Sequence, residues 1–146
     1  MSKIIKKLLL ILIMQIPALL SADEIHVSNY FHRTLVHTYV NNHIVLIDNS
    51  SPRMITLDPW PELVISLADG KHSIQELIDH IGSSYKGAPP SDYKKTIMSV
   101  VLSLKNAGYI RITTGKYELP YYLAIPHNEQ NKIKSKELML KDGYIK

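Results

Sequence analysis

The chain contains no cysteine among its 146 residues, which excludes disulfide bonds and thiolate-ligated metal sites. Glycine is also scarce, and the 6 glycines form no phosphate-binding loop, dinucleotide fingerprint or nucleophile elbow. The composition, with 45% hydrophobic and 21% charged residues, is typical of a globular protein, and a length of 146 residues predicts a single domain. We therefore expect no enzymatic activity and no cofactor.

Acidic residues are absent from the first 22 positions, where Lys3, Lys6 and Lys7 precede an uncharged run of 13 residues, Leu8–Leu20. A basic start, a short apolar stretch and small residues at its end make up a secretory signal peptide. The run is shorter than the roughly 20 residues with which a helix crosses a bilayer. We expect residues 1–22 to be a signal peptide and the protein to be periplasmic or secreted. An uncleaved membrane anchor and a buried core helix are the alternatives.

The net charge of +4 is concentrated in this leader. Without residues 1–22 the chain has 14 basic and 13 acidic side chains, and is therefore nearly neutral. Nucleic-acid binding normally requires a concentrated basic surface on the folded part of a protein. A winged-helix protein that binds DNA is therefore the less favoured interpretation. The residues that could contact phosphates in that case are Lys94, Lys95, Lys105, Arg111 and Lys116.

Seven histidines raise the question of a metal site. His32, His37 and His43 could converge if the strands that carry them pair with one another. However, no pair of histidines has the HxH or HExxH spacing that places two ligands on one element. We therefore expect no metal site.

Three segments rich in β-forming residues predict an antiparallel sheet. Residues 34–40 and 44–47 flank Asn41-Asn42, and asparagine tolerates the positive φ angles of a two-residue hairpin turn. A polar turn then leads to a third short strand at 53–57. The sequence thus predicts three strands joined by tight turns.

Capping residues predict helices after the sheet. Asp58 and Pro59 are typical of the start of a first helix, and Gly70 is expected to end it. The second helix begins with Ser73 and Glu76, whose spacing predicts a capping box in which each side chain bonds to the other residue's backbone.

A third helix is expected from residue 91 or 92 to Ala107, with Gly108 as its end. Its apolar residues cover about 200° of the circumference, whereas a one-sided surface helix needs roughly 100°. The helix should therefore contact a second surface, either the rest of the fold or a bound peptide. The apolar residues are Tyr93, Ile97, Met98, Val100, Val101, Leu102 and Leu104.

The C-terminal part gives a weaker pattern. Residues 109–113 and 116–119 flank a Thr-Gly pair and predict a C-terminal β-hairpin. From His127 onward the chain is polar and rich in lysine, and it either forms a loose amphipathic helix or stays mobile. The apolar residues of that helix would be Ile133, Leu138 and Leu140.

These elements predict an α+β fold: a small winged-helix-like domain with a three-stranded antiparallel sheet, three helices and a C-terminal β-hairpin. We expect the domain at residues 34–125. A polar, irregular extension at 23–33 would precede it, and a lysine-rich tail at 126–146 would follow.

The order of these elements resembles the PqqD-like family over about residues 34–112. The third strand enters the first helix through Ile55–Asp58, and this helix closes in LADGKHSI at 67–74, similar to the family's LxDGxxTv segment. The third helix ends in LKNAGYI at 104–110, like the family's L…xGLI ending. The resemblance implies a recognition element for ribosomally made precursor peptides, as in synthesis of the cofactor PQQ.

In that family an extended peptide is added beside the third strand, and the last helix forms the other wall. For Ile55, Leu57, Ile97 and Val101, burial in the core is the alternative. The resemblance implies a sheet edge formed by Arg53, Met54, Ile55, Thr56 and Leu57, and a helix wall formed by Lys94, Ile97, Met98, Val101 and Lys105.

The expected function is therefore non-catalytic binding of a peptide or protein partner. The alternative is an accessory structural subunit of a cell-envelope complex, in which the same surface packs permanently against a neighbouring subunit.

Overall fold

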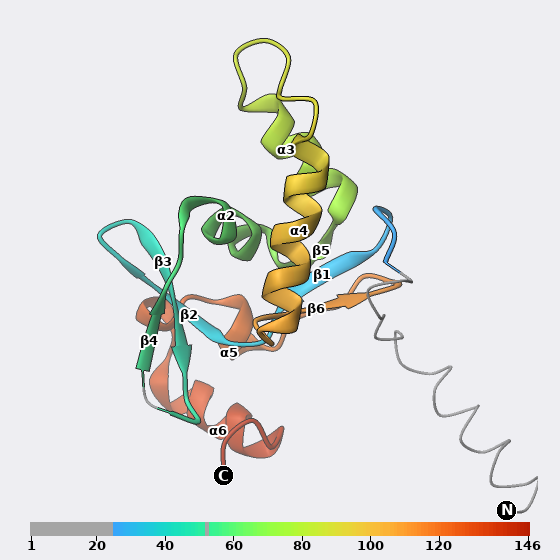
Figure 1. Cartoon of the computed structure of the whole chain (residues 1–146). Helices are drawn as coiled ribbons and strands as arrows, with labels where there is room; N and C mark the ends of the chain where they lie inside the picture. The colour runs from blue at the N-terminus through green and yellow to red at the C-terminus, as the bar shows by residue number, and fades with distance from the viewer. Residues whose placement is uncertain (1–24, 52) are drawn as a thin grey trace, which may run out of the picture.

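The computed structural model describes residues 25–51 and 53–146 (Figure 1). The expected signal peptide, residues 1–22, lies outside the described residues. The described part is α+β and contains two three-stranded antiparallel sheets and five α-helices. None of these helices has the length and apolar character needed to cross a membrane.

The sheet expected from the sequence is present, with strand order β2-β3-β4. It consists of β2 (Val36–Val40), β3 (His43–Asp48) and β4 (Arg53–Thr56). Asn41 and Asn42 have φ angles of 51° and 66°, the left-handed conformation of a type I′ hairpin turn. The predicted hairpin is therefore confirmed.

A second sheet, with strand order β5-β1-β6, was not expected from the sequence. Its central strand β1 (Tyr30–Arg33) pairs antiparallel with β5 (Asp69–Ser73) and with β6 (Ile110–Thr113). The prediction that residues 23–33 are irregular is therefore wrong for Tyr30–Arg33. The predicted C-terminal hairpin is also wrong, because β6 pairs with β1 and residues 116–119 form no strand.

The three predicted helices are α2 (Pro59–Leu67), α3 (Ile74–Ser83) and α4 (Tyr93–Asn106). The capping box of α3 is confirmed. The Ser73 hydroxyl accepts the backbone N–H of Glu76 at 3.1 Å, and the Glu76 carboxylate accepts that of Ser73 at 3.3 Å. These bonds satisfy donors that a helix start leaves free.

The C-terminal tail is folded onto β2 and comprises α5 (Tyr121–Ala124), a 3₁₀ turn η2 (His127–Glu129) and α6 (Lys132–Lys141). A helix is thus present in the tail, but its expected apolar face is wrong for two residues. Ile133 and Leu140 are 74% and 47% exposed. The buried residues of α6 are Ser135 and Met139.

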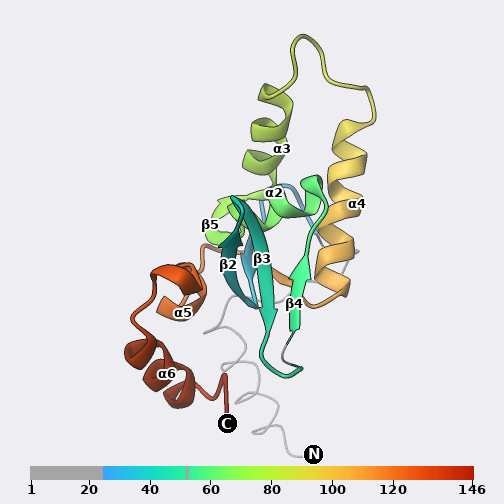
Figure 2. The ribbon, with the colours of Figure 1, turned by 90° about the vertical axis from the view of Figure 1, so that its left-hand side faces the viewer.

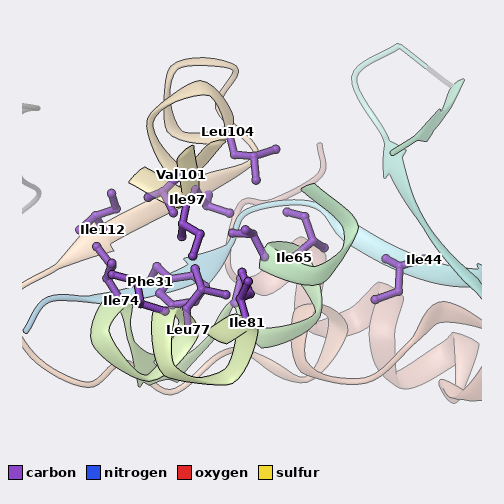
Figure 3. Packing of buried hydrophobic residues seen from close by; sticks show 14 of the residues in the cluster. Phe31, Ile44, Ile65, Ile74, Leu77, Ile81, Ile97, Val101, Leu104 and Ile112 are labelled. Atoms are coloured by element: carbon purple, nitrogen blue, oxygen red, sulfur yellow. The ribbon is translucent and has the colours of Figure 1, made fainter. Parts of the chain in front are cut away.

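The main hydrophobic core lies between the second sheet and the helices α3 and α4. Figure 3 shows Phe31 of β1 and Ile112 of β6 gathered with Leu77 of α3 and Ile97 of α4. Each such side chain contributes roughly 1.5–3 kcal/mol to the stability of the folded protein when it is fully buried. A smaller cluster joins the first sheet to the tail and consists of Val36, Leu119, Tyr122, Leu123 and Met139.

Gly70 does not end α2 as predicted, because Ala68 is the C-cap and Gly70 lies within β5. Its φ is +82°, and a Cβ added there would lie 2.0 Å from the carbonyl oxygen of Tyr117. The backbone N–H of Tyr117 donates to the Gly70 carbonyl at 2.9 Å. Glycine is therefore required both by the backbone conformation and by the close approach of the segment that follows β6.

Gly70→Ala should destabilise the protein much more than Gly108→Ala. Both glycines have nearly the same positive φ, +82° and +83°, so each substitution costs about 1–2 kcal/mol of conformational strain. Only Gly70 also has a neighbour in the way, since a Cβ at Gly108 would meet nothing within 4 Å. Urea unfolding should show that Gly70→Ala lowers the free energy of unfolding by about 2 kcal/mol more than Gly108→Ala does. Equal losses would contradict the close approach of Tyr117.

Candidate functional site

A groove of about 430 Å³ lies between the end of β4, the start of α2 and one face of α4. This volume is within the range of ligand-binding pockets. Figure 2 shows α4 on the β4 side of the first sheet, with α5 and α6 on the β2 side. The residues that line the groove from β4 and α2 are Thr56, Leu57, Asp58 and Pro61.

The wall contributed by α4 consists mostly of small side chains at helical spacing of three and four residues. The hydroxyls of Thr96 and Ser99 donate to the carbonyl oxygens of Asp92 and Lys95, at 3.2 Å and 3.1 Å. Because these hydroxyls bond to their own helix, this wall provides space more than directed hydrogen bonds. The lining residues of α4 are Thr96, Ser99, Val100, Ser103, Leu104 and Ala107.

Strand β4 is an edge strand that pairs only with β3. Within the described chain, no backbone hydrogen bond from another segment reaches its outer side. In an antiparallel pair, alternate residues direct N–H and C=O groups away from the partner, so this edge can accept another strand. Met54 is 57% exposed on this strand, and the Arg53 guanidinium lies 3.5 Å from the Asp48 carboxylate.

The C-terminal tail covers the first part of the opposite edge strand, β2, whereas Tyr39 and Val40 at its end are exposed. Both η2 and α5 pack against β2, and the Thr38 hydroxyl donates to the Asn128 side chain at 3.3 Å. The Tyr144 hydroxyl donates to the Thr34 carbonyl oxygen at 2.9 Å. None of the described residues after Ala107 lines the groove beside β4. The tail thus packs over part of one edge of the sheet and leaves the groove at the other edge unfilled.

The strand residues predicted for the site are close to the groove. Thr56 and Leu57 line it directly. Arg53, Met54 and Ile55 belong to the same edge, although they lie outside the lining. Ile55 and Leu57 are half-buried and pack against the main core, so each contributes to stability as well as to the edge.

The helix residues predicted for the site do not line the groove. Ile97 and Val101 are fully buried in the main core, which is the alternative considered for them above, so neither side chain faces the groove. Met98 is half-buried against the same core, Lys94 is exposed and Lys105 is half-buried outside the lining. The apolar stripe of α4 faces the core, and the groove lies along the neighbouring face. The small residues at 96, 99, 103 and 107 are the sequence pattern that could have revealed this face.

Comparison with known proteins yields no relative: no family model, curated protein or solved structure matches the chain. Membership of the PqqD-like family therefore stays a prediction. Function is inferred from the groove and the edge strand.

The three histidines considered for a metal site lie in different environments. His43 is exposed, and its Nδ1 lies 3.2 Å from the Glu62 carboxylate. The Nδ1 atoms of His32 and His37 are buried and have no hydrogen-bond partner in the described part of the chain. Across residues 25–51 and 53–146, no three His, Cys, Asp or Glu side chains form a group that could hold a metal ion.

Burial lowers the pKa of both His32 and His37 to about 4, because the charged imidazolium loses its hydration. The positive charges of Arg111 and Arg33 contribute to this lowering of the pKa of His32, and that of Arg33 contributes for His37. The ring of His32 also stacks on Tyr117, with 4.3 Å between the centroids. Both histidines are therefore neutral in the folded protein at neutral pH.

The protein should lose stability as the pH falls from about 6.5 towards 4. In this range the unfolded chain binds protons at His32 and His37, and the folded protein does not, so protonation favours unfolding. We expect a total loss on the order of 3 kcal/mol between pH 7 and pH 4.5, measured by urea unfolding. His37→Phe should flatten this dependence, whereas substitution of the exposed His127 by Gln should preserve it. An unchanged pH dependence in His37→Phe would show that this histidine is not responsible.

Proposed function

We propose that the protein is a non-catalytic binding module that takes up an extended peptide segment of a partner as an additional strand beside β4. The observation that carries this proposal is the unpaired edge of β4 next to the groove along α4. In β-strand addition, main-chain hydrogen bonds supply affinity, and pockets for alternate side chains supply selectivity. Both requirements are met at this edge of the sheet.

The lining of the groove indicates the kind of peptide that would bind. Leu57, Pro61, Val100 and Leu104 offer apolar contacts, and small hydroxyl residues leave room between them. Because side chains alternate along a strand, every second residue of the peptide would point into the groove, and those residues should be apolar. Asp58 is the one charged lining residue, so a basic side chain is favoured at its end of the groove.

The resemblance to the PqqD-like family supports the same site, since it implies a peptide beside the third strand of the first sheet. We include in the proposal that the domain is a winged-helix-like relative of that family. Apart from β5, which lies between α2 and α3, the order β2, β3, β4, α2, α3, α4 agrees with this relationship. The second sheet and the folded C-terminal tail are additions to the expected layout.

Filling the groove should weaken peptide binding. The full chain is immobilised and used to select peptides from a random phage-displayed library, and the enriched peptides are synthesised for titration. Ser103→Tyr places a bulky ring in the groove and should weaken binding about 10-fold or more. Asn106→Tyr is the matched control, because this residue is exposed on the same helix outside the lining, and binding should be unchanged.

Two results would refute the proposed site. One is equal affinity of the selected peptides for Ser103→Tyr and the unaltered protein, provided that both have the same melting temperature. The other is selection of peptides whose apolar residues lack the two-residue alternation that an added strand requires.

We also propose that residues 1–22 direct export of the protein. Cleavage after Ala22 would leave all described residues in the mature chain. Cell fractionation followed by N-terminal sequencing should therefore find a mature protein that starts at Asp23, outside the cytoplasm. Recovery of uncleaved chain from the cytosolic fraction would contradict export.

A further inference from the structure

A second cavity, of about 390 Å³, lies on the other side of the first sheet, between the strands β2 and β3 and the C-terminal tail. Figure 2 shows α6 beside the β2 side of this sheet. The cavity shares no lining residue with the groove beside β4, so it is a separate site.

The walls of this cavity are mainly apolar. Val36 and Met139 are buried members of the second hydrophobic cluster, and Ile47 and Ile145 are half-buried against it. Water gains few hydrogen bonds in such a space, whereas a hydrocarbon chain would bury apolar surface. The chemistry of the walls therefore favours an aliphatic ligand.

The two buried polar residues of the lining, Gln130 and Ser135, already have hydrogen-bond partners. The Gln130 amide nitrogen donates to the carbonyl oxygens of Tyr122 and Ile125, at 2.9 Å and 2.7 Å. The Ser135 hydroxyl donates to the amide oxygen of Gln130 at 2.7 Å. These bonds hold α5 and α6 together, so an apolar ligand would leave no buried polar group of this pair unsatisfied.

The charges at the cavity are all of one sign. Lys132 and Lys136 are exposed one helical turn apart on α6, and the lining contains no carboxylate. Neither lysine forms an ion pair within the described residues. Asp48 directly precedes the lining residue Asn49. Its carboxylate accepts a hydrogen bond from the Ser50 hydroxyl and lies near the Arg53 guanidinium. An anionic group at the rim would therefore meet two free ammonium groups.

We propose that this cavity binds a single-chain fatty acid, with the hydrocarbon chain between the sheet and α6 and the carboxylate beside Lys132 and Lys136. The apolar walls favour a hydrocarbon chain, and the two lysines favour a negatively charged head group. This site is independent of peptide binding beside β4.

Titration of the full chain with dodecanoate, below its critical micelle concentration, tests the proposal by calorimetry. The double variant Lys132→Glu/Lys136→Glu should weaken binding about 10-fold, as expected from the loss of two solvent-exposed charge pairs and their replacement by repulsion. The matched control is Lys94→Glu/Lys95→Glu, which makes the same change of charge at exposed positions of α4 and should bind dodecanoate normally. Dodecyltrimethylammonium, which has the same chain and the opposite charge, should bind at least about 10-fold more weakly than dodecanoate.

A second variant tests the cavity itself. Ile145→Trp fills the space from a half-buried position near the C-terminus and should remove dodecanoate binding without loss of fold. In backbone NMR spectra, dodecanoate should shift the amide signals of Val36, Ile47 and Met139. The proposal would be overturned if dodecanoate and dodecyltrimethylammonium bound equally well. It would also be overturned if Lys132→Glu/Lys136→Glu or Ile145→Trp bound dodecanoate as well as the unaltered protein. Shifts confined to other parts of the chain would overturn it as well.

Discussion

The buried side chain of Arg33 links the second sheet to α2 and to the C-terminal tail. From β1, the guanidinium donates to the carbonyl oxygen of Ile65 at 3.0 Å and to that of Leu123 at 3.2 Å and 3.3 Å. Burial lowers the pKa of Arg33, and the negative charge of Asp69 acts in the opposite direction. An unpaired buried cation is strongly destabilising, so the fold depends on these hydrogen bonds. They connect the second sheet to α2 and to α5 at the start of the tail.

The tail creates an asymmetry between the edges of the first sheet. Natural proteins protect edge strands against pairing with other chains, by covering them or by placing charges on them. Here Val36 and Thr38 of β2 are buried beneath the tail, whereas Met54 of β4 is mostly exposed. The uncovered edge is also the one beside which α4 presents its small residues. A free edge and an open groove therefore occur together, and this combination is the physical basis of the proposed peptide site.

Local chemistry made part of this structure predictable. The Asn41-Asn42 turn, the capping box of α3 and the end of α4 near Gly108 each depend on a few adjacent residues, and all were predicted correctly. Strand β1 was missed because its four residues, YFHR, include two polar side chains that are buried only by distant segments. The residues that line the groove on α4 differ from those expected for a related reason: a broad apolar arc on a helix does not show which of its faces meets the core. Edge strand β4 could be predicted, but the coverage of β2 by the tail could not, because it depends on contacts between residues about 90 positions apart.

Amide hydrogen exchange in the free, full-length protein tests the central claim most directly. If the edge of β4 is open, the amides of alternate residues in Arg53–Thr56 should exchange as rapidly as those of exposed loops. The amides of Val36–Thr38, which the tail covers, should exchange much more slowly. Uniformly slow exchange along β4 would show that its outer edge is already occupied, and it would contradict the account of this sheet as a receptor for an added strand.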